Sequence, residues 1–125
     1  MAVSEGFREF CQVMDPKYTP PNRETVRNLI KSLDQETKDN LKTELAASPW
    51  VAITSDLWTD RRTRAYIALT AHFYDTNGDI KTATMCCETF HVRETGENIA
   101  ARILNILQSY EVQDKIVCGC SDDGE

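Results

Sequence analysis

The spacing of apolar residues divides the 125-residue chain into a helical first part and an alternating second part. From Ser4 to Met14, apolar side chains recur at intervals of three, four and seven residues, which predicts a short amphipathic helix capped by Ser4. Pro16, Pro20 and Pro21 then predict an extended linker, because proline disfavours helix at its own position and at the one before it.

A second, longer helix is expected to begin after Asn22, whose side chain can cap it, and to end at Ser48-Pro49. One face of this helix carries Val26, Leu29, Ile30, Leu33, Leu41 and Leu45. Asp34-Gln35 is a candidate break within it. We therefore divide the chain into a helical lead-in with a Pro-rich linker, residues 1–49, and a second domain, residues 50–125.

Beyond residue 49 the apolar period changes to two, which predicts strands. The expected strands are Trp50–Ser55, Arg64–Tyr74 and about Ile80–Thr89. Asn77-Gly78 predicts a two-residue hairpin turn, because both residues tolerate the positive φ that such a turn requires. A turn of this length places Phe73 opposite Thr82 and Leu69 opposite Cys86.

The last part of the chain predicts a helix and one further strand. Thr95 can cap the helix, whose apolar stripe is Ile99, Ile103, Ile106, Leu107 and Tyr110. Lys115–Cys120 is nearly all apolar, which is typical of a central parallel strand covered on both faces. The element order is β-β-β-α-β, and a right-handed crossover makes the last strand parallel to the first. We expect an α/β fold, with a mixed sheet preceded by a helical segment.

Two acidic residues lie at the expected carboxyl ends of the first and last strands, Asp56 and Asp122. A buried carboxylate is costly to desolvate unless it is paired or binds a metal. Two of them side by side would form a divalent-cation site of the kind used in phosphoryl transfer. The alternative is that Asp56 caps a turn or pairs with Arg61, and that Asp122 belongs to a frayed terminus.

A basic turn follows Asp56. Arg61, Arg62 and Arg64 could neutralise DNA phosphates beside the acids. The alternative is a solvated hairpin tip in which these arginines offset nearby acidic residues. Trp58 is expected to pack in the core.

The composition narrows the choice of function. A net charge of −6 and a pI near 4.9 exclude a domain that binds nucleic acid through its bulk field, so any DNA contact must be local. No apolar run approaches the ~20 residues that a membrane span needs, and the first residues do not form a signal peptide. The five cysteines are odd in number and are expected to be reduced, which suits an intracellular protein. A zinc site drawn from Cys86, Cys87, His72 or His91 is the alternative to burial as small hydrophobes.

Several stretches resemble the hAT-superfamily transposases, and above all their domesticated, BED-type zinc-finger relatives. They include Leu41–Leu45, Ser55–Thr59, Ala65–Phe73, Gly96–Ala100 and Ile116–Asp122. The resemblance implies the first half of a ribonuclease H-like fold. It also implies that Asp56 and Asp122 are the first two acids of an Asp-Asp-Glu triad, which holds Mg²⁺ or Mn²⁺ in the complete parent domain. The resemblance also places Trp58 beside the acid pair, where a role in positioning the acids is the alternative to core packing. The third acid lies outside this sequence.

The sequence thus predicts a fragment of a hAT transposase-derived, nuclear DNA-binding protein that is catalytically incomplete and binds no metal of its own. DNA is the expected partner of the full-length parent, which is either a transposase or a transcription regulator, and no membrane is expected. Two alternatives stay open. One is a non-enzymatic interaction scaffold, a homo-oligomer formed through the incomplete sheet. The other is an inert remnant of a mobile element.

Overall fold

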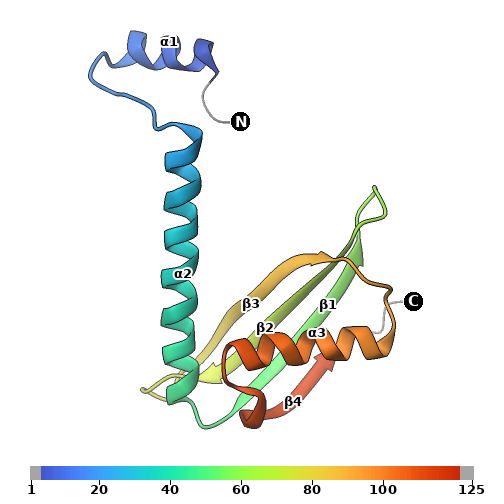
Figure 1. Ribbon diagram of the computed structural model, residues 1–125. Helices are drawn as coiled ribbons and strands as arrows, with labels where there is room; N and C mark the ends of the chain where they lie inside the picture. Colours follow the sequence, from blue (N-terminus) through green and yellow to red (C-terminus); the bar gives the residue numbers. More distant parts are fainter. Residues whose placement is uncertain (1–3, 122–125) are drawn as a thin grey trace. The chain divides into compact units, whose positions relative to one another are not determined.

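A computed structural model describes residues 4–121 (Figure 1). The elements in chain order are α1 (Glu5–Met14), α2 (Arg23–Ala47), β1 (Val51–Thr59), β2 (Ala65–Tyr74), β3 (Ile80–Phe90), α3 (Gly96–Ser109), a 3-10 turn η1 (Gln113–Lys115) and β4 (Ile116–Ser121). The chain forms two compact units, one up to residue 38 and one from residue 39, so the last part of α2 belongs with the sheet. The division into domains after residue 49 stays a prediction. Within residues 4–121, no helix has the length and apolar character needed to cross a membrane.

The first unit holds α1, the linker and the beginning of α2. Ser4 takes the N-cap position of α1, although its side chain accepts no hydrogen bond there. Asn22 caps α2 as expected, since its Oδ1 accepts the backbone N–H of Thr25 at 2.8 Å. The expected break at Asp34-Gln35 does not occur, and α2 is one helix of 25 residues. Lys38 pairs with Asp34 at 2.7 Å, one turn away, which favours helix across that point.

The second unit is built on a four-stranded sheet with the order β3-β2-β1-β4. β1 pairs antiparallel with β2, β2 pairs antiparallel with β3, and β4 pairs parallel with β1. The connection from β3 to β4 crosses one face of the sheet as α3 (Figure 1). The mixed β-β-β-α-β arrangement expected from the sequence is therefore present.

The register of the β2–β3 hairpin differs from the expectation near its turn. Tyr74 pairs with Ile80, so the connection is residues 75–79, and Phe73 lies opposite Lys81 rather than Thr82. The cause is a wider turn than the two-residue one expected. The N–H of Gly78 bonds to the carbonyl oxygen of residue 75, and the positive φ of 86° falls on Gly78 alone.

A bulge later in the same hairpin corrects this shift. The register changes between Leu69 and Thr70, where Met85 has no partner of its own on β2. Beyond that point Leu69 lies opposite Cys86, as the sequence predicted. The predicted alternation of β2 is also present, because its inward positions are buried from Ile67 to Phe73 at every second residue.

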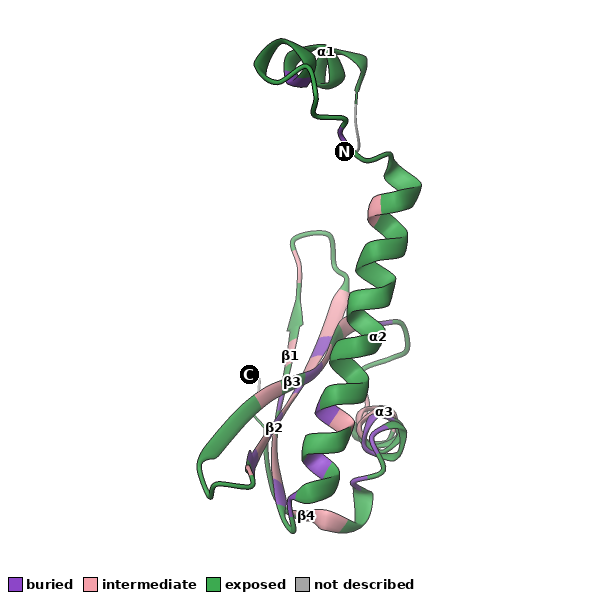
Figure 2. Ribbon diagram, turned by 90° about the vertical axis from the view of Figure 1, so that its left-hand side faces the viewer, coloured by how far each residue is buried: buried purple, intermediate pink, exposed green. Residues whose placement is uncertain are grey.

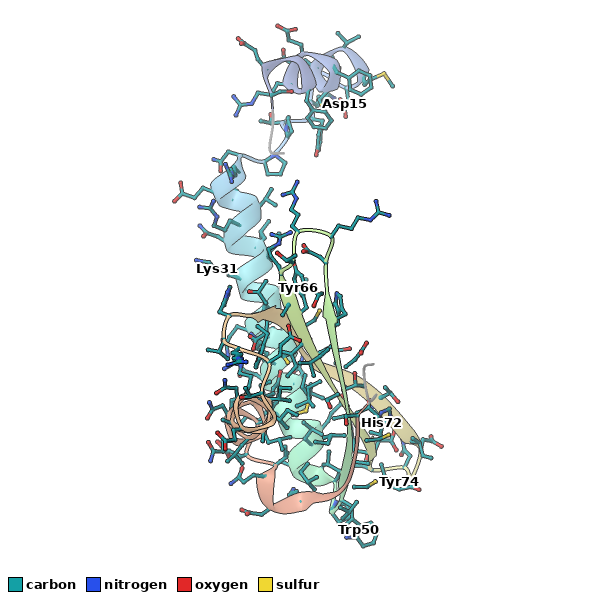
Figure 3. All side chains as sticks on the ribbon, turned by 90° about the vertical axis from the view of Figure 1, so that its right-hand side faces the viewer. Asp15, Lys31, Trp50, Tyr66, His72 and Tyr74 are labelled. Carbon is teal, nitrogen blue, oxygen red and sulfur yellow. The ribbon has the colours of Figure 1, made fainter. Side chains whose placement is uncertain are left out.

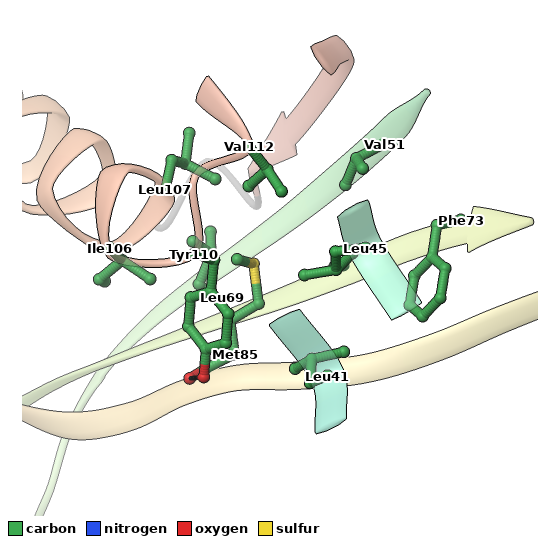
Figure 4. Close-up of a cluster of buried hydrophobic side chains, with 11 residues drawn as sticks. Leu41, Leu45, Val51, Leu69, Phe73, Met85, Ile106, Leu107, Tyr110 and Val112 are labelled. Atoms are coloured by element: carbon green, nitrogen blue, oxygen red, sulfur yellow. Dashed lines mark hydrogen bonds between the residues drawn. The ribbon is translucent and has the colours of Figure 1, made fainter. Parts of the chain in front are cut away.

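The hydrophobic core lies between one face of the sheet and two helices, α3 and the end of α2 (Figure 4). Its buried members are Leu41, Leu45, Val51, Leu69, Ala71, Phe73, Met85, Ile106, Leu107, Tyr110 and Val112. The hydroxyl of Tyr110 donates to the carbonyl oxygen of Met85 at 2.9 Å, so this polar group stays hydrogen-bonded inside the core. Figure 2 shows both helices on the same side of the sheet. The described residues provide no helix for the other side, which we call the open face.

Lys115 closes the end of α2 from a distant part of the chain. Its Nζ donates to the carbonyl oxygens of Leu45, Ala46 and Ser48 at 3.2, 2.6 and 3.1 Å. These carbonyls lack partners within the helix, and a cation there also offsets the helix dipole. The last turn of α2 has no basic residue of its own. Lys115 therefore ties α2 to the start of β4.

β4 is not the covered central strand that its apolar sequence suggested. It lies at an edge of the sheet, and every residue after Ile116 is exposed. In residues 4–121 no element pairs with its outer side or covers its open face. An apolar run indicates burial only when the rest of the fold supplies a cover, and this part of the chain does not supply one.

Candidate nucleic-acid interface

Asp56 lies inside β1 and does not end it. The strand continues to Thr59, and Asp56 pairs with Ala68. The expected strand Trp50–Ser55 is therefore wrong at both ends. Pairing continues because the turn that closes the hairpin begins only at Asp60. Asp56 is exposed on the open face, between the buried Ser55 and the half-buried Leu57.

The adjacency on which the acidic pair depends is present. β1 and β4 run parallel as neighbours, and Ser55 pairs with Ser121. The residues that precede the two acids are thus partners in the sheet. Asp122 itself lies outside the described residues. Its assignment, together with that of Asp56, stays a prediction.

The described residues do not by themselves fit a resident divalent cation. Between residues 4 and 121 there is no group of three or more His, Cys, Asp or Glu side chains placed to hold a metal. Asp56 supplies one carboxylate, and Mg²⁺ held by so few protein ligands relies on waters and substrate phosphates.

The residues of the alternative zinc site do not lie together either. Cys86 lies opposite Leu69, on the covered face, and burial raises the pKa of its thiol. Cys87 lies opposite Ala68, on the open face. His72 is engaged elsewhere, because its two ring nitrogens lie 3.2 and 3.1 Å from the hydroxyls of Thr54 and Thr82.

The basic turn is a rigid tip organised by Asp60. Its Oδ1 accepts the backbone N–H groups of Arg62 and Arg64 at 2.8 and 2.9 Å. The N–H of Thr63 bonds to the carbonyl oxygen of Asp60 at 2.9 Å, and Thr63 has a φ of 59°. Sequence reasoning missed this role of Asp60, although an aspartate that opens a polar turn is a known signal.

Arg64 pairs with Asp60, so its guanidinium is not free to contact a DNA phosphate as the sequence suggested. Its NH2 and Nε atoms lie 2.7 and 2.9 Å from Oδ2 of Asp60. The backbone N–H of Arg64 and then its guanidinium hold the pKa of Asp60 below the ordinary aspartate value. The guanidinium also lies 5.9 Å from the centre of the Tyr66 ring. Arg64 therefore stiffens the tip.

Trp58 does not belong to the core. It lies directly opposite Tyr66 on the open face, and the two rings stack with centroids 5.5 Å apart and planes 11° from parallel. Trp58 remains 40% exposed. The labelled Tyr66 in Figure 3 lies close to the hairpin tip, while His72 lies farther along the sheet. The stack thus supports the two strands that carry the tip.

Arg61 and Arg62 are the available cations of the tip. Both are exposed, and no side chain in the described part of the chain pairs with either guanidinium. Arg93 adds a third such group. It lines a pocket of about 610 Å³ together with Thr63 and Arg64, next to His91 and Glu94.

Arg93 was missed because it is distant in sequence from the other arginines. It follows β3, which runs in the same direction as β1 and ends at the same end of the sheet. Its carbonyl oxygen accepts the N–H of Thr95 at 2.8 Å and the side-chain amide of Asn98 at 2.8 Å. Thr95 in turn caps α3, as predicted, by accepting the N–H of Asn98. The sequence feature that could have identified Arg93 is its position two residues before Thr95, the residue that caps α3.

Comparison with known proteins agrees with this fold. The family described as the ZBED1 RNase-like domain matches residues 54–125. The chain belongs to this family. The resemblance to hAT transposase-derived proteins of the BED type is thereby confirmed, and with it the partial ribonuclease H-like fold.

Two curated proteins show a more distant similarity. One is the "Putative transcriptional regulator tpeD" of Talaromyces stipitatus, 22% identical over 82% of this chain and 12% of the relative. The other is the "Zinc finger BED domain-containing protein RICESLEEPER 3" of Oryza sativa subsp. japonica, 22% identical over 89% of this chain and 15% of the relative. The chain thus spans less than a sixth of the length of either. No solved structure gave a significant match.

Proposed function

We propose that this chain is part of a transposase-derived nuclear protein, and that Arg61 and Arg62 contact DNA phosphates. The observation that carries the proposal is a pair of exposed guanidinium groups, without side-chain partners in the described part of the chain, on a tip held rigid by Asp60 and Arg64. Because Asp60 already fixes the backbone of the tip, binding an anion there has to order only the arginine side chains, whose planar guanidinium matches the oxygens of a phosphate.

The contact is local and sequence-independent. The net charge of −6 repels a polyanion at long range, so the tip has to approach while the acidic remainder of the chain stays away from the duplex. Arg93 extends the cationic surface toward β3 along the pocket that it shares with Arg64. Phosphate contacts of this kind set position and orientation but do not read bases.

The relatives support the cellular setting. One is named as a transcriptional regulator and the other as a BED-type zinc-finger protein. We infer from these names that the full-length product works in the nucleus on DNA, as a regulator and not as a transposase. The proposal assigns no strand transfer to this chain. In this proposal, Asp56 and Asp122 correspond to the first two acids of the ancestral triad. If Mn²⁺ broadens the NMR signals of neither residue, they are not metal ligands in this chain.

The decisive experiment measures binding of a short fluorescent duplex by anisotropy at low salt. The variant Arg61→Ala/Arg62→Ala is compared with the parent. We expect about tenfold weaker binding, ~1.4 kcal/mol, and a salt dependence lower by about two charges. The loss should be the same for unrelated duplex sequences, because phosphates carry no sequence information.

A matched control removes the same charge elsewhere. Lys17 and Lys31 are exposed residues of the first unit, and Lys17→Ala/Lys31→Ala changes the net charge equally. This control should bind DNA almost as the parent does. Equal losses in both double variants would mean that only net charge matters. Equal weak binding by the parent and the tip variant would refute the proposal and favour a scaffold or an inert remnant.

A further inference from the structure

The turn between β2 and β3, residues 75–79, contains the one asparagine of the chain that precedes a glycine, Asn77. The other five asparagines each precede a residue with a larger side chain: Asn22, Asn28, Asn40, Asn98 and Asn105. Asparagine is among the least durable residues, because the backbone nitrogen of the next residue can attack its side-chain amide. A side chain on that next residue hinders the attack, and glycine has none.

The structure also separates Asn77 from the other five by conformation. Asn22 caps α2, and the side-chain amide of Asn98 donates to the carbonyl oxygen of Arg93 at 2.8 Å. The remaining three lie inside helices: Asn28, Asn40 and Asn105. In a helix, the N–H that follows each asparagine is bonded to the preceding turn. These five side chains are therefore held away from the nitrogen that would attack them.

Asn77 lacks such restraints. It is exposed, and its side-chain amide makes no hydrogen bond within residues 4–121. Gly78 has a φ of 86°, and a Cβ at this position would meet no atom within 4 Å, so the space beside the turn is open. The N–H of Gly78 bonds to the carbonyl oxygen of Asp75 at 3.1 Å, the longest of the four hydrogen bonds that close the turn. One long, exposed bond therefore restrains the attacking nitrogen.

We propose that Asn77 is a site of spontaneous deamidation in the folded chain. The backbone nitrogen of Gly78 loses its proton and bonds to the side-chain carbonyl carbon of Asn77, and the amide nitrogen takes up a proton and leaves as ammonia. Water then opens the five-membered imide at either carbonyl carbon, which gives aspartate or isoaspartate. The net change consumes one water and releases one ammonia. It does not depend on the proposed DNA contact.

Either product places a new carboxylate between Asp75 and Asp79. The carboxylate of Asp75 is the centre of this turn, because its Oδ1 accepts the backbone N–H groups of Asn77 and Asp79 at 2.8 and 3.0 Å. A second negative charge two residues away opposes that carboxylate in its charged form. Charge alone therefore weakens the turn.

Isoaspartate adds a second effect, because its main chain runs through the Cβ carbon and is one atom longer. The N–H of Gly78 is then displaced from the carbonyl oxygen of Asp75 that it bonds in the unmodified chain. Lys81 follows this turn, and its Nζ lies 3.3 Å from Glu44 and 4.0 Å from Asp75. Loosening of the turn therefore reaches the contact between β3 and the end of α2.

Ageing of the folded chain at mildly alkaline pH tests the site, with ion-exchange chromatography and peptide mapping by mass spectrometry as the measurements. A species with one more negative charge should accumulate in proportion to the hydroxide concentration, and mapping should place the change at residue 77. Asn77→Gln should not form this species, because glutamine would have to close a six-membered ring. Asn40→Gln, the matched control inside α2, should age as the parent does.

The same measurement in urea shows whether the fold permits the reaction. The rate in native buffer should be no more than about tenfold below the rate in urea, because a single exposed hydrogen bond restrains the nitrogen. Conversion in urea alone would mean that the turn protects Asn77, and this result would overturn the proposal. Equal ageing of Asn77→Gln, or a change that maps to another asparagine, would overturn it as well.

Urea unfolding of the purified forms tests the effect on the hairpin. Asn77→Asp has the new charge without the longer main chain. Its unfolding midpoint should therefore lie between those of the unmodified parent and the isoaspartate form. An isoaspartate form as stable as the parent would refute the loosening of the turn.

Discussion

The two hairpin tips, residues 60–64 and 75–79, have the same pattern of backbone hydrogen bonds but differ in their side chains. In each tip an aspartate comes first, and its Oδ1 accepts the N–H groups of the residues two and four positions later. In each, the N–H of the fourth residue bonds to the carbonyl oxygen of the aspartate. The same polar skeleton therefore closes both ends of β2.

The difference lies at the position of positive φ and in the charge. The tip 75–79 has Gly78 there, which adopts a φ of 86° without strain. The tip 60–64 has Thr63 at 59°, although a β-branched residue rarely adopts this conformation. The strained tip is also the one with three arginines, whereas the relaxed tip has two aspartates.

This contrast teaches where to look for function. Strain that the fold tolerates, next to exposed charge, tends to occur at functional sites. Local stability alone would favour glycine at both tips. The tip 60–64 departs from that choice at the same place where Arg61 and Arg62 are presented, which agrees with the proposed phosphate contact.

The largest expected effect comes from making the relaxed tip resemble the strained one. Gly78→Thr should lower the free energy of unfolding by about 2 kcal/mol, because the new residue is forced into the left-handed region. A Cβ at this position meets no atom within 4 Å, so the cost arises from φ and not from a clash. Urea unfolding measures it. Gly78→Asn is the control and should lose less, since asparagine tolerates positive φ.

The reverse exchange should give a smaller gain. Thr63→Gly relieves the left-handed strain, but the more flexible unfolded chain offsets part of it, leaving a stabilisation of about 0.5–1 kcal/mol. The same urea experiment reports it. Thr63→Ala keeps a Cβ and should give little of this gain. If Thr63→Gly is no more stable than Thr63→Ala, then the tip is not strained and the contrast with 75–79 fails.

The smallest effect concerns the two aspartates. Backbone N–H donors, with Arg64 first for Asp60 and Asp79 first for Asp75, hold the pKa of both carboxyls below the ordinary value of about 3.9. Because the folded pKa is lower than the unfolded one, their contribution to stability is present above the unfolded pKa. It is lost as pH falls through the folded pKa.

NMR titration of the two carboxyls can separate backbone from side-chain causes. Arg64→Ala removes the guanidinium but keeps the backbone N–H of residue 64. The pKa of Asp60 should therefore rise but stay below the ordinary value, while the pKa of Asp75 should not change. A full return of Asp60 to the ordinary value would mean that the ion pair, and not the shared backbone, sets its pKa.

Local chemistry made much of the fold predictable. The helices follow the 3.6-residue period, and the caps at Asn22 and Thr95 depend on bonds three residues away. The alternation of β2 identified its covered face. The hairpin register was wrong near its turn, because turn type depends on several weak bonds that residues 77 and 78 alone do not reveal.

The candidate site was only partly predictable. Arg61 and Arg62 lie where the basic turn placed them, but Arg64 pairs with Asp60, which corresponds to the alternative in which the arginines offset nearby acidic residues. Arg93 joins the same end of the sheet through strand direction, a property of the whole topology. Asp56 has the neighbouring strand it was predicted to have, yet it lies within β1 and exposed.

The sequence by itself determined the helices, the strands and their order, because periodicity, caps and turn residues act over a few neighbouring positions. The family followed from the same short stretches of sequence. Only the tertiary structure decided that β4 is an exposed edge, that Lys115 closes α2, and that Arg93 lies in one pocket with Arg64. Each of these depends on which distant segments meet, and that is set by the packing of the sheet and α3 as a whole rather than by any local pattern.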